Sequence, residues 1–145
     1  MTEIQERTGL EVLDRQECLA LLARCSLGRI AVVGDGGRPL IFPVNFALDG
    51  DAIVLRTNPG TKLREATRGW VAFECDGVDS TYHAGWSVLV SGVAEQVHNA
   101  GEIADLERLP LALWAPGPKS TWLRIRPQVL TGRRIPPHGR QPSGC

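Results

Sequence analysis

The sequence lacks the residue spacings that hold a metal ion. Its four cysteines form no Cys-x-x-Cys pair and have no histidine at ligand spacing, which argues against a zinc or iron–sulfur site. Cys18, Cys25 and Cys75 fall in expected helices or strands, where a thiol usually packs as a small apolar side chain. We therefore expect no bound metal.

An excess of charge of either sign is also missing. The 16 basic and 16 acidic side chains balance, so neither nucleic acid nor an anionic membrane is an expected partner. No apolar run is long enough for a membrane-spanning helix, and no signal-peptide pattern precedes the first expected element. We expect a cytoplasmic protein whose 145 residues form one main domain.

The sequence contains neither a G-x-G-x-x-G nor a P-loop lysine motif, so a doubly wound nucleotide-binding sheet is not favoured. Short apolar segments separated by glycine-rich turns are present instead. They predict helices over residues 15–25, 59–67 and 100–109, and strands over residues 29–33, 38–48, 52–55, 70–75, 86–97, 121–126 and 129–135. Hairpin links without regular βαβ alternation favour a mostly antiparallel barrel of about six strands.

Two glycine-containing regions refine this prediction. Gly92 lies inside the long strand over residues 86–97 and marks a bulge or a bend. Residues 76–84 show no period and are expected to form a loop. His83 lies in that loop without a visible partner, so it is a catalytic residue only in principle, and no side chain is assigned a catalytic role.

The strand over residues 38–48 carries a proline and an amide on its mixed face. Pro43 cannot donate to a sheet ladder, and Asn45 brings a polar side chain to the same face. This combination indicates an edge or an opening where backbone groups can meet a ligand. An ordinary edge strand with one polar residue explains the pattern equally well.

A possible anion site follows the strand over residues 52–55. Arg56, Thr57, Thr61 and Lys62 surround the start of an expected helix, and unpaired N–H groups at a helix start favour a phosphate. The alternative is that Asn58 caps the helix, the next residue is its first, and the basic side chains are solvated.

Several of these segments, in this order, resemble the pyridoxamine 5′-phosphate oxidase-like, FMN-binding split β-barrel family. The resemblance covers roughly residues 14–135. The segments that carry it are residues 27–31, residues 39–46, the stretch from Arg56 to Lys62, residues 85–92, and residues 131–133.

The resemblance implies a mainly β (α+β) fold, a six-stranded antiparallel split β-barrel with short flanking helices. An N-terminal arm (residues 1–13), a flavin-binding domain (14–136) and a disordered C-terminal tail (137–145) would make up the chain. The family forms homodimers with flavin at the subunit interface. By this resemblance the phosphate is held by Arg56, Thr57, Thr61 and Lys62, the isoalloxazine lies beside Phe42, Pro43, Val44 and Asn45, and Trp86 and Ser87 reach the cofactor or the dimer seam.

For Trp86 the alternative is a side chain buried under the barrel. The expected function is a flavin-dependent oxidoreductase that uses FMN and acts on a small molecule. Vitamin B6 oxidation is not expected, because near the C-terminus only Arg133 and Arg134 represent the basic set that grips pyridoxal phosphate. Two alternatives remain open: a reductase of the same fold that uses the deazaflavin coenzyme, and a non-catalytic dimer that binds flavin or haem.

Overall fold

One antiparallel sheet runs through the described part of the chain and curls at one end into a half-barrel. The computed structural model describes residues 9–113 and 121–137. Hydrogen bonds connect the strands in the order β3-β2-β6-β7-β8-β5-β4, with β9 paired to β7 and β1 paired to β9. The strands are β1 (Glu11–Leu13), β2 (Leu27–Val33), β3 (Pro39–Asn45), β4 (Ala47–Asp49), β5 (Ala52–Thr57), β6 (Trp70–Asp79), β7 (Ala84–Val97), β8 (Thr121–Ile125) and β9 (Val129–Ile135), and the α-helices are α1 (Arg15–Ala23), α2 (Thr61–Ala66) and α3 (Ala100–Leu106).

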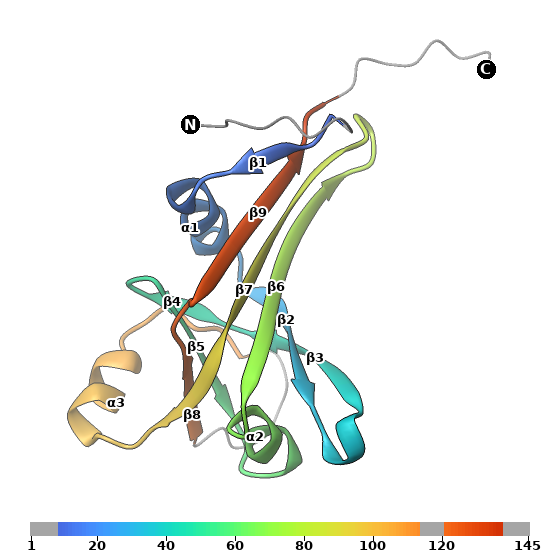
Figure 1. The fold of residues 1–145 in the computed structure, drawn as a ribbon. Helices are drawn as coiled ribbons and strands as arrows, with labels where there is room; N and C mark the ends of the chain where they lie inside the picture. Colours follow the sequence, from blue (N-terminus) through green and yellow to red (C-terminus); the bar gives the residue numbers. More distant parts are fainter. Residues whose placement is uncertain (1–8, 114–120, 138–145) are drawn as a thin grey trace.

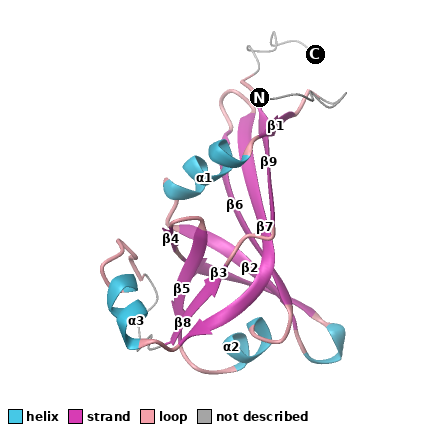
Figure 2. Ribbon diagram, turned by 60° about the vertical axis from the view of Figure 1, so that its left-hand side comes forward, coloured by secondary structure: helices cyan, strands magenta, loops and turns pink. Residues whose placement is uncertain are grey.

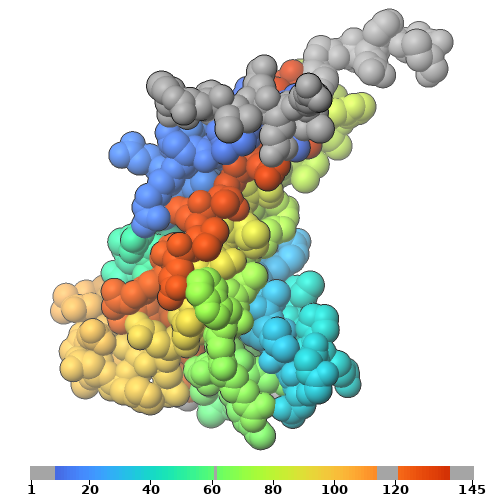
Figure 3. Space-filling view, viewed as in Figure 1, coloured from blue at the N-terminus to red at the C-terminus, as the bar shows by residue number. Residues whose placement is uncertain are grey.

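The sheet has a tall part and a curled part (Figure 1). In the tall part β6, β7 and β9 rise together, and α1 packs against β9 (Figure 2). In the curled part β2, β3, β4, β5 and β8 surround the lower end, with α2 beneath it and α3 to one side. Figure 3 shows β9, β7 and β6 side by side across the face in view. The expected mainly β class with short flanking helices is confirmed.

The structure divides the chain into more strands than the sequence predicted. The expected run over residues 38–48 breaks at Phe46, whose N–H donates to the carbonyl of Ser26 at 3.1 Å. Residues 11–13, expected in the N-terminal arm, pair with β9 as β1. The expected loop over residues 76–84 is wrong in its first part, because β6 continues to Asp79 through pairing with β7. Residues 1–8 of the arm and 138–145 of the tail lie outside the described residues.

The first helix begins at a capping box, whose sequence signature is Asp14 followed three residues later by Glu17. Asp14 Oδ1 accepts a hydrogen bond from the N–H of Glu17 at 2.8 Å, and the N–H of Asp14 donates to Glu17 Oε1 at 3.4 Å. Cys18 on this helix and Cys75 on β6 are buried in the core, as expected of small apolar side chains. In the described residues no helix has the length and apolarity to cross a membrane, and no group of three or more ligating side chains is placed to bind a metal.

Two apolar clusters hold the fold together. The larger cluster fills the inner face of the sheet, and a smaller one lies between α3 and the outer side of β5 and β8. The smaller cluster consists of Ala47, Val54, Val97, Leu106 and Trp122. Strand β5 is therefore buried on both faces, which fixes the direction in which its last residues leave the sheet.

Gly92 marks the point where β7 changes its partner. Residues 85–91 of β7 pair with β9, and residues 94–97 pair with β8. A Cβ atom on Gly92 would come within 2.4 Å of the carbonyl oxygen of Arg126, so the backbones approach each other too closely for any side chain. The expected bulge or bend coincides with this exchange of partners.

Replacing Gly92 with alanine should lower the free energy of unfolding by roughly 1–3 kcal/mol, because the new methyl group meets a backbone carbonyl that cannot rotate away. A Cβ on Gly69 would find no heavy atom within 4 Å, so Gly69→Ala is a matched control with little expected effect. Urea unfolding of the two variants makes the comparison. Equal stability of G92A and the wild type would contradict the close approach.

Candidate functional site

Strand β3 lies at one end of the strand order and pairs with β2 alone among the described strands. The edge predicted from Pro43 and Asn45 is therefore confirmed. Pro43 is exposed, Val44 is buried in the core, and Phe42 is half-buried on the inner face. The Asn45 amide donates to the carbonyl of Ser26 at 3.2 Å, which ties β3 to the segment before β2. The outer edge of β3 thus offers backbone groups in a fixed position.

Helix α2 begins later than the sequence indicated. Its N-cap is Gly60, and no side chain caps it, so the alternative in which Asn58 is the cap is wrong. The reason is geometric: the chain bends at Pro59 and Gly60, Gly60 still has non-helical dihedral angles, and the helix begins only at Thr61, of which the backbone alone is described. Because α2 has six residues, a macrodipole contributes little. Any anion site here depends on side-chain charges.

Both basic side chains of this stretch lie over aromatic rings. The guanidinium of Arg56 is 4.9 Å from the ring centroid of Trp122, its register partner on β8. Lys62 Nζ is 5.5 Å from the ring centroid of Phe42 on β3. A cation over a ring face is attracted by the negative face of the aromatic ring. The structure therefore steadies each cation with a different strand.

The guanidinium of Arg56 has an unsatisfied donor. Its Nε is buried and has no hydrogen-bond partner among the described residues. Buried donors are normally paired, so this atom is one that an anionic group would satisfy. Thr57 is buried beside it, and its hydroxyl donates to the carbonyl of Asn58 at 3.4 Å.

Trp86 and Ser87 lie in a different part of the molecule. Both line a cavity of about 430 Å³ near the tip of the β6–β7 hairpin, together with Arg133 and Ile135. Gly77 makes room for Trp86, because a Cβ there would come within 2.5 Å of the indole Nε1. Trp86 is half-buried rather than fully covered.

The candidate residues of one chain therefore form two groups. Trp70, which begins β6 just after α2, and Gly77, opposite Trp86, are about 23 Å apart at about 3.3 Å per residue. One group surrounds α2 and β3, and the other lies on β7. The structure does not bring them together within one chain.

The outward face of the tall sheet holds a charge cluster that sequence reasoning missed. Arg29 Nη1 lies 3.6 Å from Glu74 Oε1 and 3.4 Å from Asp76 Oδ2. Burial raises the pKa of Glu74 to about 7, and a hydrogen bond with Asp76 and its negative charge add to the rise, while Arg29 opposes it. The only signal in the sequence was an acidic residue inside the apolar run over residues 70–75. Trp122 was missed as well, because its role depends on the pairing of β8 with Arg56.

The raised pKa of Glu74 makes the stability of the fold depend on pH. The folded protein holds this proton more tightly than the unfolded chain, whose carboxyl titrates near its ordinary value of 4.5. The stabilisation is complete below about pH 4.5 and is lost as the pH rises through about 7. Replacing Glu74 with glutamine removes the titration, so the variant should gain melting temperature relative to the wild type between about pH 5 and about pH 8.

Thermal melts at the two pH values measure this gain. Glu107→Gln, an exposed change on α3, is the control and should show the same difference from wild type at both. A Glu74→Gln difference that does not change with pH would contradict the raised pKa.

Comparison with known proteins places the chain in one family. The sequence profile described as "Pyridoxamine 5'-phosphate oxidase" matches residues 14–134. The uncharacterized protein Rv0080 of Mycobacterium tuberculosis is 35% identical over 136 residues, which cover 90% of this chain and 88% of that protein. The match therefore spans almost the whole described region.

Solved structures give the same result for the fold. The FAD binding protein of Mycobacterium smegmatis has a TM-score of 0.73 and 39% sequence identity, covering 85% of this chain and 95% of that one. A protein of Corynebacterium glutamicum has a TM-score of 0.77 and 36% identity, covering 91% of this chain and 97% of that one. Both similarities extend over the tall and the curled parts of the sheet.

Proposed function

Because the chain belongs to the pyridoxamine 5′-phosphate oxidase family, we propose that it binds a flavin and acts as an oxidoreductase on a small-molecule substrate. The observation that carries the proposal is that the two cations on either side of the β5–α2 link both lie over aromatic rings: Arg56 over Trp122 of β8, and Lys62 over Phe42 of the edge strand β3. The FAD binding protein of Mycobacterium smegmatis, at 39% identity, supports a flavin as the ligand.

The residues present fit a flavin phosphate. The orphaned Nε of Arg56 needs an acceptor, and phosphate oxygens form strong charge-assisted hydrogen bonds with guanidinium and ammonium groups. Arg56 and Lys62 would supply charge, and the backbone N–H of Thr61 at the start of α2 would supply a donor, with Thr57 beside them in sequence. The β3 side chains next to the isoalloxazine would be Phe42, on the inner face, and Asn45, at the end of the strand.

The bound flavin would supply hydride transfer, and the protein would supply binding, orientation and electrostatics. The outer edge of β3 would meet the polar edge of the isoalloxazine with backbone groups of residues 42–45, although Pro43 has no N–H to give. No side chain of this chain is assigned a catalytic step. Oxidation of a vitamin B6 phosphate is outside the proposal. Of the basic residues expected near the C-terminus to bind pyridoxal phosphate, only Arg133 and Arg134 are present.

A homodimer completes the proposal. Trp86 and Ser87 are too far along β7 to share a ligand with Arg56 in one chain, so a flavin that meets both groups needs two copies. The outward sheet face is suited to such contact. Apart from Tyr82 and Leu113, every large apolar side chain that the described residues expose lies on it: Leu27, Val33, Ile41, Trp70, Val78, Leu89, Val93, Val129 and Ile135. Exposed apolar side chains gathered on one face indicate an interaction site.

Removing both cations tests the phosphate clamp. In the double variant Arg56→Ala, Lys62→Ala the dissociation constant for FMN should rise at least about 30-fold, since each charged hydrogen bond contributes about 1.5–3 kcal/mol. The control is Arg64→Ala, which removes an exposed charge from the same helix and should change affinity less than about threefold. Flavin fluorescence titration measures all three proteins.

Circular dichroism checks that the double variant is folded. A folded double variant with wild-type affinity would refute the assignment of Arg56 and Lys62 to the phosphate, while leaving flavin binding elsewhere on the protein as the result.

The identity of the flavin is tested by parallel titration. We expect FMN to bind more tightly than riboflavin, because the clamp recognises the phosphate, and FAD is the competing ligand because of the Mycobacterium smegmatis protein. The deazaflavin coenzyme is the fourth ligand titrated. If FAD or the deazaflavin coenzyme binds more tightly than FMN, that ligand is the cofactor instead of FMN. If riboflavin binds as tightly as FMN, the phosphate clamp is refuted.

A further inference from the structure

We propose that the Glu74–Asp76 carboxyl pair couples self-association through the outward sheet face to the uptake of a proton. The inference rests on the proposed homodimer and adds its regulation: the complex forms best when the pair holds one proton, and it weakens as the pH rises above neutrality.

The pair is short of positive charge and of hydrogen-bond donors. One guanidinium, that of Arg29, serves both carboxylates at 3.6 Å and 3.4 Å. Glu74 Oε1 is buried and has no hydrogen-bond donor among the described residues. A proton held between two neighbouring carboxyl groups is the donor that this oxygen lacks.

The surroundings of the pair do not supply the missing charge. On β7 the register partners of Glu74 and Asp76 are Leu89 and Ser87, which carry none. On β3 the register partner of Arg29 is Pro43. The next cation on this face is Arg133 of β9, which lies opposite Ser87 and is thus two strand spacings, about 10 Å, from Asp76.

Covering this face would remove the water that now reaches the cluster. The side chains of Glu74 and Asp76 are 36% and 35% exposed, and that of Arg29 is 49% exposed. Two copies meeting on this face would bring together two clusters, each with two carboxylates for one arginine. Desolvating unpaired negative charge is costly, so the covered state favours the protonated pair more than the free chain does.

The sign of the effect follows from the titration of the free chain. The pKa of Glu74 is already raised to about 7, and burial on docking raises it further. Association is therefore independent of pH well below 7, where both states hold the proton. Above 7 the free chain loses the proton, and each proton taken up on docking weakens association by up to about tenfold per pH unit.

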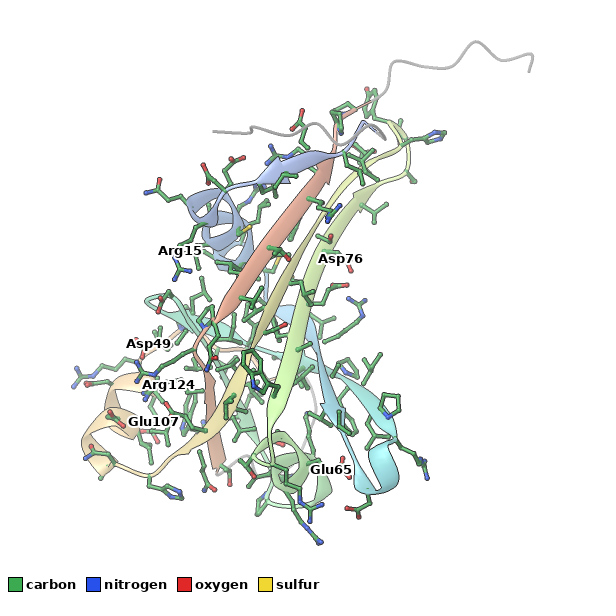
Figure 4. All side chains as sticks on the ribbon, in the orientation of Figure 1. Arg15, Asp49, Glu65, Asp76, Glu107 and Arg124 are labelled. Atoms are coloured by element: carbon green, nitrogen blue, oxygen red, sulfur yellow. The ribbon has the colours of Figure 1, made fainter. Side chains whose placement is uncertain are left out.

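The dissociation constant of the homodimer, measured by sedimentation equilibrium between about pH 6 and about pH 8.5, tests the inference. For the wild type we expect it to rise at least about tenfold across this range. Glu74→Gln cannot ionise, and its amide can donate to Asp76, so this variant should keep the tight low-pH value throughout. Glu107→Gln, on α3 and well separated from Asp76 (Figure 4), is the control and should retain the wild-type pH dependence.

Three results would overturn the inference. A wild-type dimer whose dissociation constant does not change with pH would refute the proton coupling and leave the dimer intact. A Glu74→Gln dimer with an unchanged pH slope would assign the proton to another group. A monomer at every pH, with flavin still bound, would refute both the dimer and its regulation, while leaving the phosphate clamp standing.

Discussion

In the part of the chain that the structure describes, α1 and α2 pack on the inner face of the sheet, and on its outer side only β5 and β8 are covered, by α3. The inner face is filled by a continuous apolar cluster with α1 and α2 packed against it. On the outward face of β2, β3, β6, β7 and β9 large apolar side chains remain exposed, including Ile41 and Trp70 at 67% and 56%. Burying apolar surface is the main favourable term in folding and association. This uncovered face therefore favours association with a partner.

The positions of the candidate flavin-binding residues follow from the way the sheet curls into a half-barrel at one end (Figure 1). Strand β5 is buried on both sides, so its end delivers Arg56 to a fixed position against Trp122. Helix α2 lies beneath the half-barrel and carries Lys62 to the ring of Phe42 on the edge strand. The same curl leaves Trp86 at the far end of the tall sheet. In the proposed homodimer, a site that uses all of these residues would be complete only when two copies meet, which would link flavin binding to the uncovered face.

Much of this arrangement was predictable from local sequence signals. The capping box of Asp14, the edge position of Pro43 and the special place of Gly92 each have a local chemical cause, and the structure shows the box, the edge and an exchange of strand partners at Gly92. What local signals could not give were the long-range partners. The stacking of Arg56 on Trp122 depends on the register of β5 with β8, and the charge cluster depends on that of β2 with β6. The start of α2 was misplaced because Asn58 and Pro59 have the residue types of a helix start, whereas the chain bends there and Gly60 is the N-cap.

A crystal structure of the protein with bound flavin would show whether the β3–β5–α2 region anchors the cofactor. We expect a phosphate within hydrogen-bond distance of Arg56 and Lys62, and an isoalloxazine along the outer edge of β3 with Trp86 or Ser87 of the second copy beside it. A flavin found instead within one chain at the cavity near the β6–β7 tip, with its phosphate on Arg133, would refute this position of the cofactor.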